Sequence, residues 1–236
     1  MEKSSVADIR ARFDNDVERF SSLETGQESV VDARTMLDRT TKAAAMTTPN
    51  ATHVLDVGCG AGNYSLKLLQ HLDDLHVDLV DLSQPMLDRA VERVGAATDG
   101  TVRPLQADIR ELSLQTAQYD IIVAAAVLHH LRTDDEWTAV AQKLYESLRP
   151  GGAVWVADLV THRTTAVRKL MWTAYGDYLE DRDGEAYREQ VFNYIEQEDT
   201  PRPLLEQVDC FRAAGFDAAE ILHKNATFGA FGALKR

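Results

Sequence analysis

The fold is decided by the stretch Val54-Leu55-Asp56-Val57-Gly58-Cys59-Gly60-Ala61-Gly62-Asn63-Tyr64, in which an apolar run ends in three alternating glycines and a helical pattern follows. Glycines at such a point let the backbone turn tightly and let a ligand approach the amide groups at a helix N-terminus. The spacing differs from the dinucleotide fingerprint G-x-G-x-x-G, because the third glycine comes one residue too early. The sequence contains no G-x-x-x-x-G-K-[ST] pattern, which excludes a P-loop nucleotide-binding protein.

Downstream of this turn, short β-type runs alternate with helical patterns. Repeated strand–helix–strand spacing predicts right-handed crossovers and a mostly parallel sheet covered by helices on both faces. The sequence Arg-Pro-Gly-Gly at 149–152 is typical of a compact turn into the last of these strands. We therefore expect an α/β fold with a doubly wound, Rossmann-like sheet, whose first five strands occupy residues 53–57, 76–80, 102–107, 119–124 and 153–159.

Helices are predicted at both ends of this core. Ser5 and Asp8 have the spacing of a capping box at the start of an N-terminal helix. A last helix is expected to begin with Thr200 as its N-cap and Pro201 at its first helical position. Gly215 stands where a glycine commonly ends a helix.

A chain of 236 residues fits one domain with an elaboration. Two β-type runs at 218–222 and 228–234, separated by residues 223–227, predict an antiparallel hairpin that completes a seven-stranded sheet. The single domain 1–236 then consists of an N-terminal helical cap (1–48), an α/β core (53–160), a helical lid insert (161–199), and a C-terminal helix with the hairpin (200–236).

The composition excludes several classes of protein. The net charge of −13 argues against a broad face for nucleic-acid phosphates or an anionic membrane. The longest apolar run, 121–128, is far shorter than the ~20 residues of a membrane helix, and the first residues lead into no apolar signal segment. Two widely separated cysteines offer neither a disulfide framework nor a CxxC metal pair. We expect a soluble, cytoplasmic protein, with a homodimer left open.

Two carboxylates follow predicted strands. Asp81 closes the second strand, where it can accept both ribose hydroxyls of an adenosine lying across the strand ends. The alternative is an N-cap for the next helix, a role that Ser83 can fill equally well. Asp108 follows the third strand and is placed to accept from the amino group of an adenine, with an ordinary Asx turn as the alternative.

Together these residues resemble the class I S-adenosylmethionine-dependent methyltransferases. The resemblance implies S-adenosylmethionine as cofactor, and it implies that the protein is an enzyme. The matching stretches follow the family's order over residues 53 to 159: VLDVGCGAGNYSLKLL, VDLVDLSQPMLDRA, LQADIREL, YDIIVAAAVLHHL and LRPGGAVWVADL.

The resemblance also implies the cofactor contacts. Asp56 and the backbone of the glycine loop would hold the methionine end, Asp81 the ribose, and Asp108 with Ile109 the adenine. Cys59, within the loop, is expected to be a small buried filler and not a nucleophile. The residues assigned to the cofactor are Asp56, Gly58, Cys59, Gly60, Gly62, Asp81, Leu82, Asp108, Ile109 and, on the pocket floor, Ala124.

The pair His129-His130 follows the predicted fourth strand, at the sheet edge where open α/β folds bind ligands. A neutral imidazole there can remove a proton from an acceptor near pH 7, and Tyr175 is a further candidate. The alternative is that one histidine packs under a helix and the other faces solvent. We expect no metal site, because adjacent positions in one turn do not converge readily and no nearby Cys or Glu completes a set.

The predicted lid combines acidic and aromatic residues. Between residues 177 and 199 there are nine acidic residues and two arginines, Arg182 and Arg188. Most of these side chains fit a solvated acidic face over an aromatic packing stripe. A sharper interpretation is a lid over a small substrate, whose acidic character favours a cationic or neutral acceptor over a phosphorylated one.

Both ends of the chain, 12–17 and 225–235, also look like the carboxy-S-adenosylmethionine synthases. Those enzymes share the methyltransferase fold and carboxylate the cofactor using prephenate, with an arginine for the new carboxylate. Arg182, Arg188 and Arg202 are the candidates for that arginine here. We predict in-line methyl transfer to a small-molecule acceptor, with such a synthase or a non-catalytic S-adenosylmethionine-binding protein as the alternatives.

Overall fold

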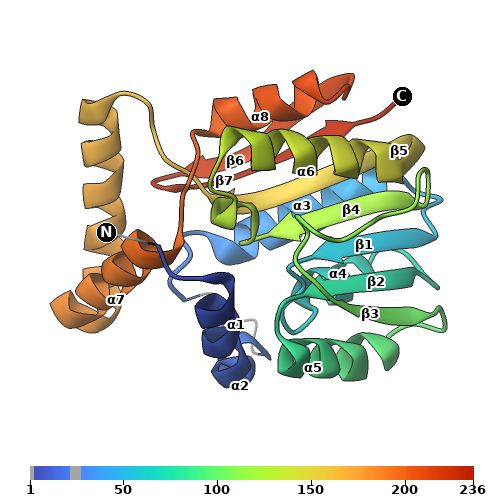
Figure 1. Cartoon of the computed structure of the whole chain (residues 1–236), viewed down its shortest axis with the longest axis horizontal. Helices are drawn as coiled ribbons and strands as arrows, with labels where there is room; N and C mark the ends of the chain where they lie inside the picture. The colour runs from blue at the N-terminus through green and yellow to red at the C-terminus, as the bar shows by residue number, and fades with distance from the viewer. Residues whose placement is uncertain (1–2, 22–27) are drawn as a thin grey trace.

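A computed structural model describes residues 3–21 and 28–236 (Figure 1). One seven-stranded sheet with the order β3-β2-β1-β4-β5-β7-β6 forms the centre of the molecule. The first five strands pair in parallel, and β7 runs antiparallel to both of its neighbours, which confirms the predicted α/β class. The strands are β1 (His53–Val57), β2 (His76–Asp81), β3 (Val102–Gln106), β4 (Tyr119–Ala125), β5 (Leu148–Leu159), β6 (Ala218–Asn225) and β7 (Phe228–Leu234).

Helices cover both faces of the sheet because successive strand residues point to opposite sides. In β1, Val54 packs with the core that includes α3, α4 and α5, whereas Leu55 and Val57 pack with the core that includes α6 and α8. The bounds of these helices are α3 (Ala33–Thr47), α4 (Asn63–Leu68), α5 (Gln84–Gly95), α6 (Asp134–Ser147) and α8 (Leu204–Ala213).

A second group of helices lies beside the sheet (Figure 1). The predicted N-terminal helix is divided at Asp16 into α1 (Val6–Asn15) and α2 (Val17–Ser21), and the predicted capping box of Ser5 and Asp8 is present. The predicted lid insert forms α7 (Thr165–Glu198), in which Asp183 and Gly184 leave helical geometry and separate two helical halves. None of the described helices contains a stretch long and apolar enough to cross a membrane.

Two predicted turns have different bounds in the structure, because the assigned strands extend into them. Residues 149–152 belong to β5, which pairs from Leu148 onward across a register shift opposite β4. The hairpin loop is shorter than the predicted 223–227, because β6 continues to Asn225 past a second register shift. Gly151, with a φ of +83°, still turns the backbone inside β5, and the regular pairing with β4 and β7 runs on from Ala153.

The predicted start of the last helix is also wrong. Helix α8 begins at Leu204 with Pro203 as its N-cap, so Thr200 lies outside the helix. The Thr200 amide instead donates to the His129 carbonyl over 2.7 Å, which ties this connection to the turn after β4. The predicted C-terminal glycine is confirmed, because Gly215 follows the helix with a φ of +113°.

Candidate active site

A cavity of about 520 Å³ lies at the carboxyl ends of the parallel strands. The strand order reverses direction between β1 and β4, which is where open α/β sheets bind their ligands. One wall comes from the ends of β1, β2, β4 and β5 and the loops that follow them. The opposite wall comes from α1, α2 and the second half of α7. The volume is that of a small-molecule site.

The glycine loop after β1 is held by backbone contacts. The amides of Gly58 and Cys59 donate to the Val80 carbonyl over 2.8 and 3.0 Å, which ties the loop to β2. At Gly60, with a φ of +49°, an added Cβ would meet nothing within 4 Å, so the backbone is open to a ligand. Gly62 differs, because it does not line the cavity and an added Cβ would lie 2.8 Å from Val94. The prediction that Gly62 contacts the cofactor is therefore corrected to a role in packing α4 against α5.

Two carboxylates face the cavity beside this loop, Asp56 buried and Asp81 half-buried. Asp56 accepts a hydrogen bond from the Ser65 hydroxyl over 2.6 Å, and burial raises the pKa of Asp56 to about 7. Asp81 accepts from the amides of Gly60 and Ser83 over 2.8 and 2.9 Å, and burial raises its pKa as well. The N-cap of α5 is Ser83, so the alternative considered for Asp81 is not what the structure shows.

The adenine end of the predicted site is partly as expected. Leu82 and Ile109 line the cavity, but Ala124 does not, and the next residues of the chain, Ala125 and Ala126, take its place. This corrects the prediction for Ala124, whose side chain is directed into the core that includes α6.

Asp108 lines the cavity and is bound by one arginine. Its carboxylate accepts from the Arg110 guanidinium over 2.6 and 3.0 Å and from the Arg110 amide over 2.9 Å. Burial alone would raise the pKa of Asp108, but these hydrogen bonds lower it below its usual value. The amide contact is the Asx turn that the sequence left as an alternative, so the contact of Asp108 with adenine stays a prediction.

His129 lies in the 3-10 turn η1 (Leu128–His130) and is buried between two carboxylates. Its Nδ1 donates to Asp158 Oδ1, and its Nε2 lies 3.5 Å from Asp199 Oδ1. Burial opposes a charge on this ring, but Asp158 and Asp199 outweigh burial and raise the pKa of His129 to about 9. A ring that is protonated at neutral pH cannot take a proton, so the structure contradicts the predicted role of His129 as a base.

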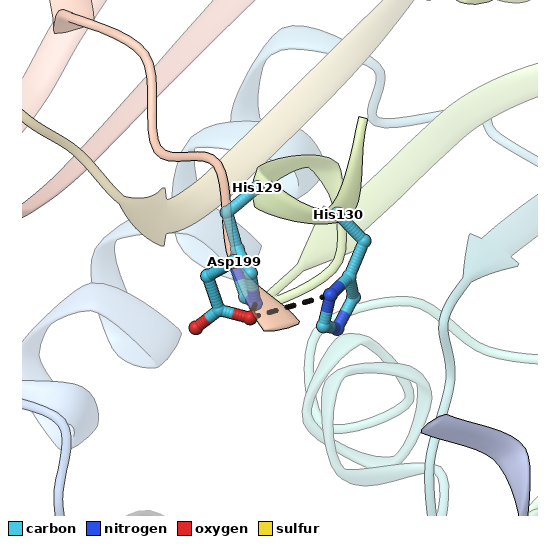
Figure 2. Close-up of side chains that lie close together, drawn as sticks. All are labelled: His129, His130 and Asp199. Carbon is cyan, nitrogen blue, oxygen red and sulfur yellow. Dashed lines mark ion pairs between the residues drawn. The ribbon is translucent and has the colours of Figure 1, made fainter. Parts of the chain in front are cut away.

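His130 has the opposite character. Burial and the neighbouring charges of His129 and Arg12 lower its pKa well below the usual value, so the ring is neutral. Its Nδ1 lies 3.3 Å from Asp199 Oδ1, and Figure 2 shows the two side chains facing each other. Within the described parts of the chain, neither of its buried ring nitrogens has a hydrogen-bond partner.

Comparison with known proteins assigns the family. A family model described as "Methyltransferase domain" matches residues 54–152. This range includes the glycine loop, the aspartates Asp56, Asp81 and Asp108, and the histidine pair. This chain is a class I S-adenosylmethionine-dependent methyltransferase. An uncharacterised methyltransferase of Mycobacterium tuberculosis is 37% identical over 119 residues, which are 50% of this chain and 55% of that protein. The carboxy-S-adenosyl-L-methionine synthase of Vibrio atlanticus is 25% identical over 191 residues, 78% of this chain and 76% of that protein.

Solved structures agree with the fold of this methyltransferase. The DhpI complex with S-adenosylhomocysteine superposes with a TM-score of 0.64 at 20% identity, over 94% of this chain and 93% of that chain. Human N-acetylserotonin methyltransferase in complex with S-adenosylmethionine superposes with a TM-score of 0.61 at 15% identity. This match covers 96% of the present chain but only 56% of the human chain, so the two proteins share one domain fold.

The described residues of the methyltransferase fit S-adenosylmethionine, its cofactor. Gly60 leaves room for a ligand against the loop backbone, and Asp56 and Asp81 present carboxylates to a ligand that carries ammonium and sulfonium charges. Leu82 and Ile109 add apolar surface on the same wall, as a flat heterocycle requires. Cys59 is buried, and burial raises the pKa of its thiol, which agrees with a filler and not a nucleophile.

Tyr175 is in the cavity wall but does not have the predicted character. Its hydroxyl donates to the Ser29 carbonyl over 2.8 Å, and burial strongly raises its pKa. A phenol that is buried and already donating is a poor proton acceptor. The structure therefore corrects the role of Tyr175 to fixing α7 against the segment before α3.

Sequence reasoning missed two carboxylates of the site. Asp158, at the end of β5, stands in one of the family stretches, which could have singled it out. Asp199, at the end of α7, was counted only as part of the acidic lid, and nothing in the local sequence connects it to the histidines. The argument that the histidine pair lacks a third ligand-type residue is wrong, since Asp199 approaches both rings.

The arginines expected from the synthase resemblance lie away from the cavity. Arg182 pairs with Glu28 over 2.9 Å, Arg188 pairs with Glu180 over 2.6 Å, and Arg202 pairs with Asp134. None of the three lines the cavity in the described structure.

Proposed function

We propose that this methyltransferase moves the methyl group of S-adenosylmethionine in line to a nucleophilic atom of a small molecule. The supporting observation is that one cavity runs from the cofactor wall at Gly60 and Asp81 to a second wall built by α1 and α7. Cofactor and acceptor can thus share one space that the helices screen from solvent.

The second wall indicates the kind of acceptor. Its surface is largely aromatic and aliphatic, and the charge of Arg12 on it is covered by Glu198, whose carboxylate accepts over 2.8 Å. Such a surface favours a neutral acceptor with an apolar body. The side chains that carry this argument are Phe13, Phe20, Tyr187, Val191, Tyr194 and Ile195.

The chain's main task in this reaction is positioning. The bound cofactor supplies a methyl group that is already activated, and holding an acceptor at near-attack distance can contribute roughly 7–11 kcal/mol of the barrier. Of the three residues predicted to take part in proton transfer, only His130 has a neutral ring with unpartnered nitrogens. We therefore place His130, and not His129 or Tyr175, next to the acceptor.

Cofactor binding and turnover test the proposal separately. Titration calorimetry of the full chain with S-adenosylhomocysteine should show binding that Asp81→Ala weakens about 10–100-fold, because charge-assisted hydrogen bonds are lost. The matched control is Asp88→Ala, an exposed carboxylate on α5. A panel of small hydroxyl, amine and thiol compounds is then screened for release of S-adenosylhomocysteine. Tight binding without turnover of any class would contradict methyl transfer to a small molecule.

A second candidate function is that of a carboxy-S-adenosylmethionine synthase. It is favoured by the 25% identity to such an enzyme, which extends over 78% of this chain. Mass spectrometry of the cofactor after incubation with prephenate distinguishes it. A sulfonium product heavier by one carboxylate would replace the proposed methyl transfer. Unchanged cofactor would leave methyl transfer in first place, in agreement with the position of the three arginines outside the cavity.

A further inference from the structure

Three polar side chains converge at one wall of the cavity (Figure 2). One ligand atom from each of His129, His130 and Asp199 lies within 4.8 Å of those of the other two, and the ring nitrogens that face Asp199 Oδ1 are His129 Nε2 and His130 Nδ1. Asp199 Oδ1 is 3.5 Å from the first nitrogen and 3.3 Å from the second. The histidines come from η1 and the aspartate from the end of α7, so two distant segments build the cluster.

The polar atoms of this cluster lack partners. The Asp199 side chain is 2% exposed, and neither its Oδ1 nor either ring nitrogen of His130 has a hydrogen-bond partner within the described residues. The separation of 3.5 Å between Asp199 Oδ1 and His129 Nε2 does not complete a hydrogen bond. Buried polar groups in native proteins are nearly always paired, so these atoms, which face one another, are placed to share one bound partner.

The surroundings hold the cluster in place. Asp158 accepts from Nδ1 of His129, which fixes the ring and directs Nε2 toward Asp199. A carboxylate behind the ring is the usual support of a metal-ligating histidine. The amide of Thr200 donates to the His129 carbonyl over 2.7 Å and so fixes Asp199 opposite the histidine pair.

We infer that His129, His130 and Asp199 bind a divalent transition-metal ion of the kind that prefers imidazole and carboxylate ligands. Ligand atoms at 2.0–2.1 Å around a tetrahedral ion stand about 3.3 Å apart, close to the two separations at Asp199. The ion would take the place of the proton on His129 Nε2, because a ligating imidazole nitrogen carries no proton. The carboxylates of Asp158 and Asp199 together match a double positive charge, while the nearby Arg12 is engaged with Glu198. All three ligands line the cavity, so a fourth position is open to an oxygen atom of a bound small molecule or water.

This inference does not depend on methyl transfer, and its test has no activity readout. The full chain without an affinity tag is freed of metal by a chelator and titrated with Co²⁺ alone. We expect one bound equivalent with the visible absorption of Co²⁺ in a nitrogen–oxygen site, which Zn²⁺ should displace. At a metal concentration 100 times the dissociation constant, Zn²⁺ should raise Tm by about 5–10 °C.

Two variants and a matched control locate the ion. Asp199→Asn and His130→Ala should each weaken Co²⁺ binding at least about 10-fold, because each removes one of three protein ligands. His71→Ala removes an exposed histidine far along the chain and should bind as the unaltered protein does.

The result can also overturn the inference. Absence of Co²⁺ absorption and of a Tm shift in the unaltered chain would do so. The inference would also fail if Asp199→Asn and His130→Ala still unfolded cooperatively and bound Co²⁺ as tightly as the unaltered chain. His130→Ala carries the test if Asp199→Asn does not fold, because no hydrogen bond of the His130 ring is lost. Binding that His76→Ala abolishes would place the ion at the His53–His76 ring pair and reject the cavity site.

Discussion

At the scale of single residues, Asp56 is the clearest case of a carboxyl group whose burial opposes its ionisation. It is 1% exposed at the end of β1, where its carboxylate accepts a hydrogen bond from the Ser65 hydroxyl. Burial outweighs that hydrogen bond and raises the pKa of Asp56 from 3.8 to about 7. The cofactor-free protein therefore keeps this carboxyl partly protonated near neutral pH, and a cationic ligand would favour its ionised form.

This shift predicts a pH dependence of stability without the cofactor. Because the folded-state pKa lies above the unfolded value, the folded protein binds more protons between about pH 4 and 7, so Asp56 lowers the free energy of unfolding as pH rises through that window. Asp56→Asn removes this pH-dependent loss. Between pH 5 and pH 7 the free energy of unfolding of the variant should therefore rise relative to that of the unaltered protein, by about 2 kcal/mol. Urea unfolding at several pH values measures the difference.

The exposed Asp88→Asn is the matched control and should follow the unaltered protein at every pH. If the curves of Asp56→Asn and of the unaltered protein ran parallel between pH 5 and 7, the carboxyl would already be ionised in the folded state. Its assignment to a cationic part of the cofactor would then lose its electrostatic support.

At the scale of elements, the change of direction within α7 shapes the cavity. Asp183 and Gly184 interrupt the helix, and Gly184 has φ and ψ of +82° and 175°. Essentially only glycine adopts that backbone region without strain. The second half of α7 can therefore turn back and bring Tyr187, Val191 and Ile195 to the cavity wall.

Replacing this glycine should strain the backbone alone. An added Cβ at Gly184 would meet nothing within 4 Å, so Gly184→Ala is expected to cost about 1–3 kcal/mol of unfolding free energy through its φ and ψ. Gly95, the last residue of α5, is also open but has no positive φ, so Gly95→Ala should be neutral or stabilise by up to about 1 kcal/mol. Chemical unfolding of both variants measures the contrast, and equal effects would show that the kink is not a glycine requirement.

These elements also show what the sequence could predict of the fold. β1 was predicted to the residue, because a buried apolar run bounded by a glycine turn is a local signal. The true starts of β5 and α8 were not predictable in that way. The first depends on pairing across a bulge with β4, and the second on the Thr200 amide bonding to His129 instead of opening a helix.

The site residues likewise differ in whether the sequence could predict their position. Asp56, Gly60 and Asp81 lie at or just beyond the carboxyl ends of strands that end at one sheet edge, so their position beside one ligand could be inferred from the order of elements. The meeting of Asp199 with His130 depends on the path of α7, which no local pattern encodes. The same holds for Tyr175, whose predicted chemistry failed because its hydroxyl finds the Ser29 carbonyl in another element.

At the scale of the whole molecule, the two walls of the cavity differ in how they are held. The sheet wall is continuous with the core, whereas α1 is tied to the end of α7 mainly by polar contacts. The Arg12 guanidinium donates to Glu198 over 2.8 Å and to the Tyr194 hydroxyl over 2.7 Å. The amide of Ser4 donates to the Gln197 carbonyl over 3.0 Å. Entry and release of ligands are therefore expected to involve α1 before any strand.

Hydrogen exchange followed by mass spectrometry tests this expectation. Arg12→Ala removes charge-assisted hydrogen bonds that are partly exposed, so the amides of α1 should exchange about 10-fold faster while those of β4 stay protected. S-adenosylhomocysteine should slow exchange in α1 of the unaltered chain, because Ile9 and Phe13 line the cavity. The exposed neighbour variant Arg10→Ala should leave both rates unchanged. If Arg12→Ala exchanged no faster, the apolar contacts of Ile9 and Phe13 would hold α1, and the cavity would have to open elsewhere.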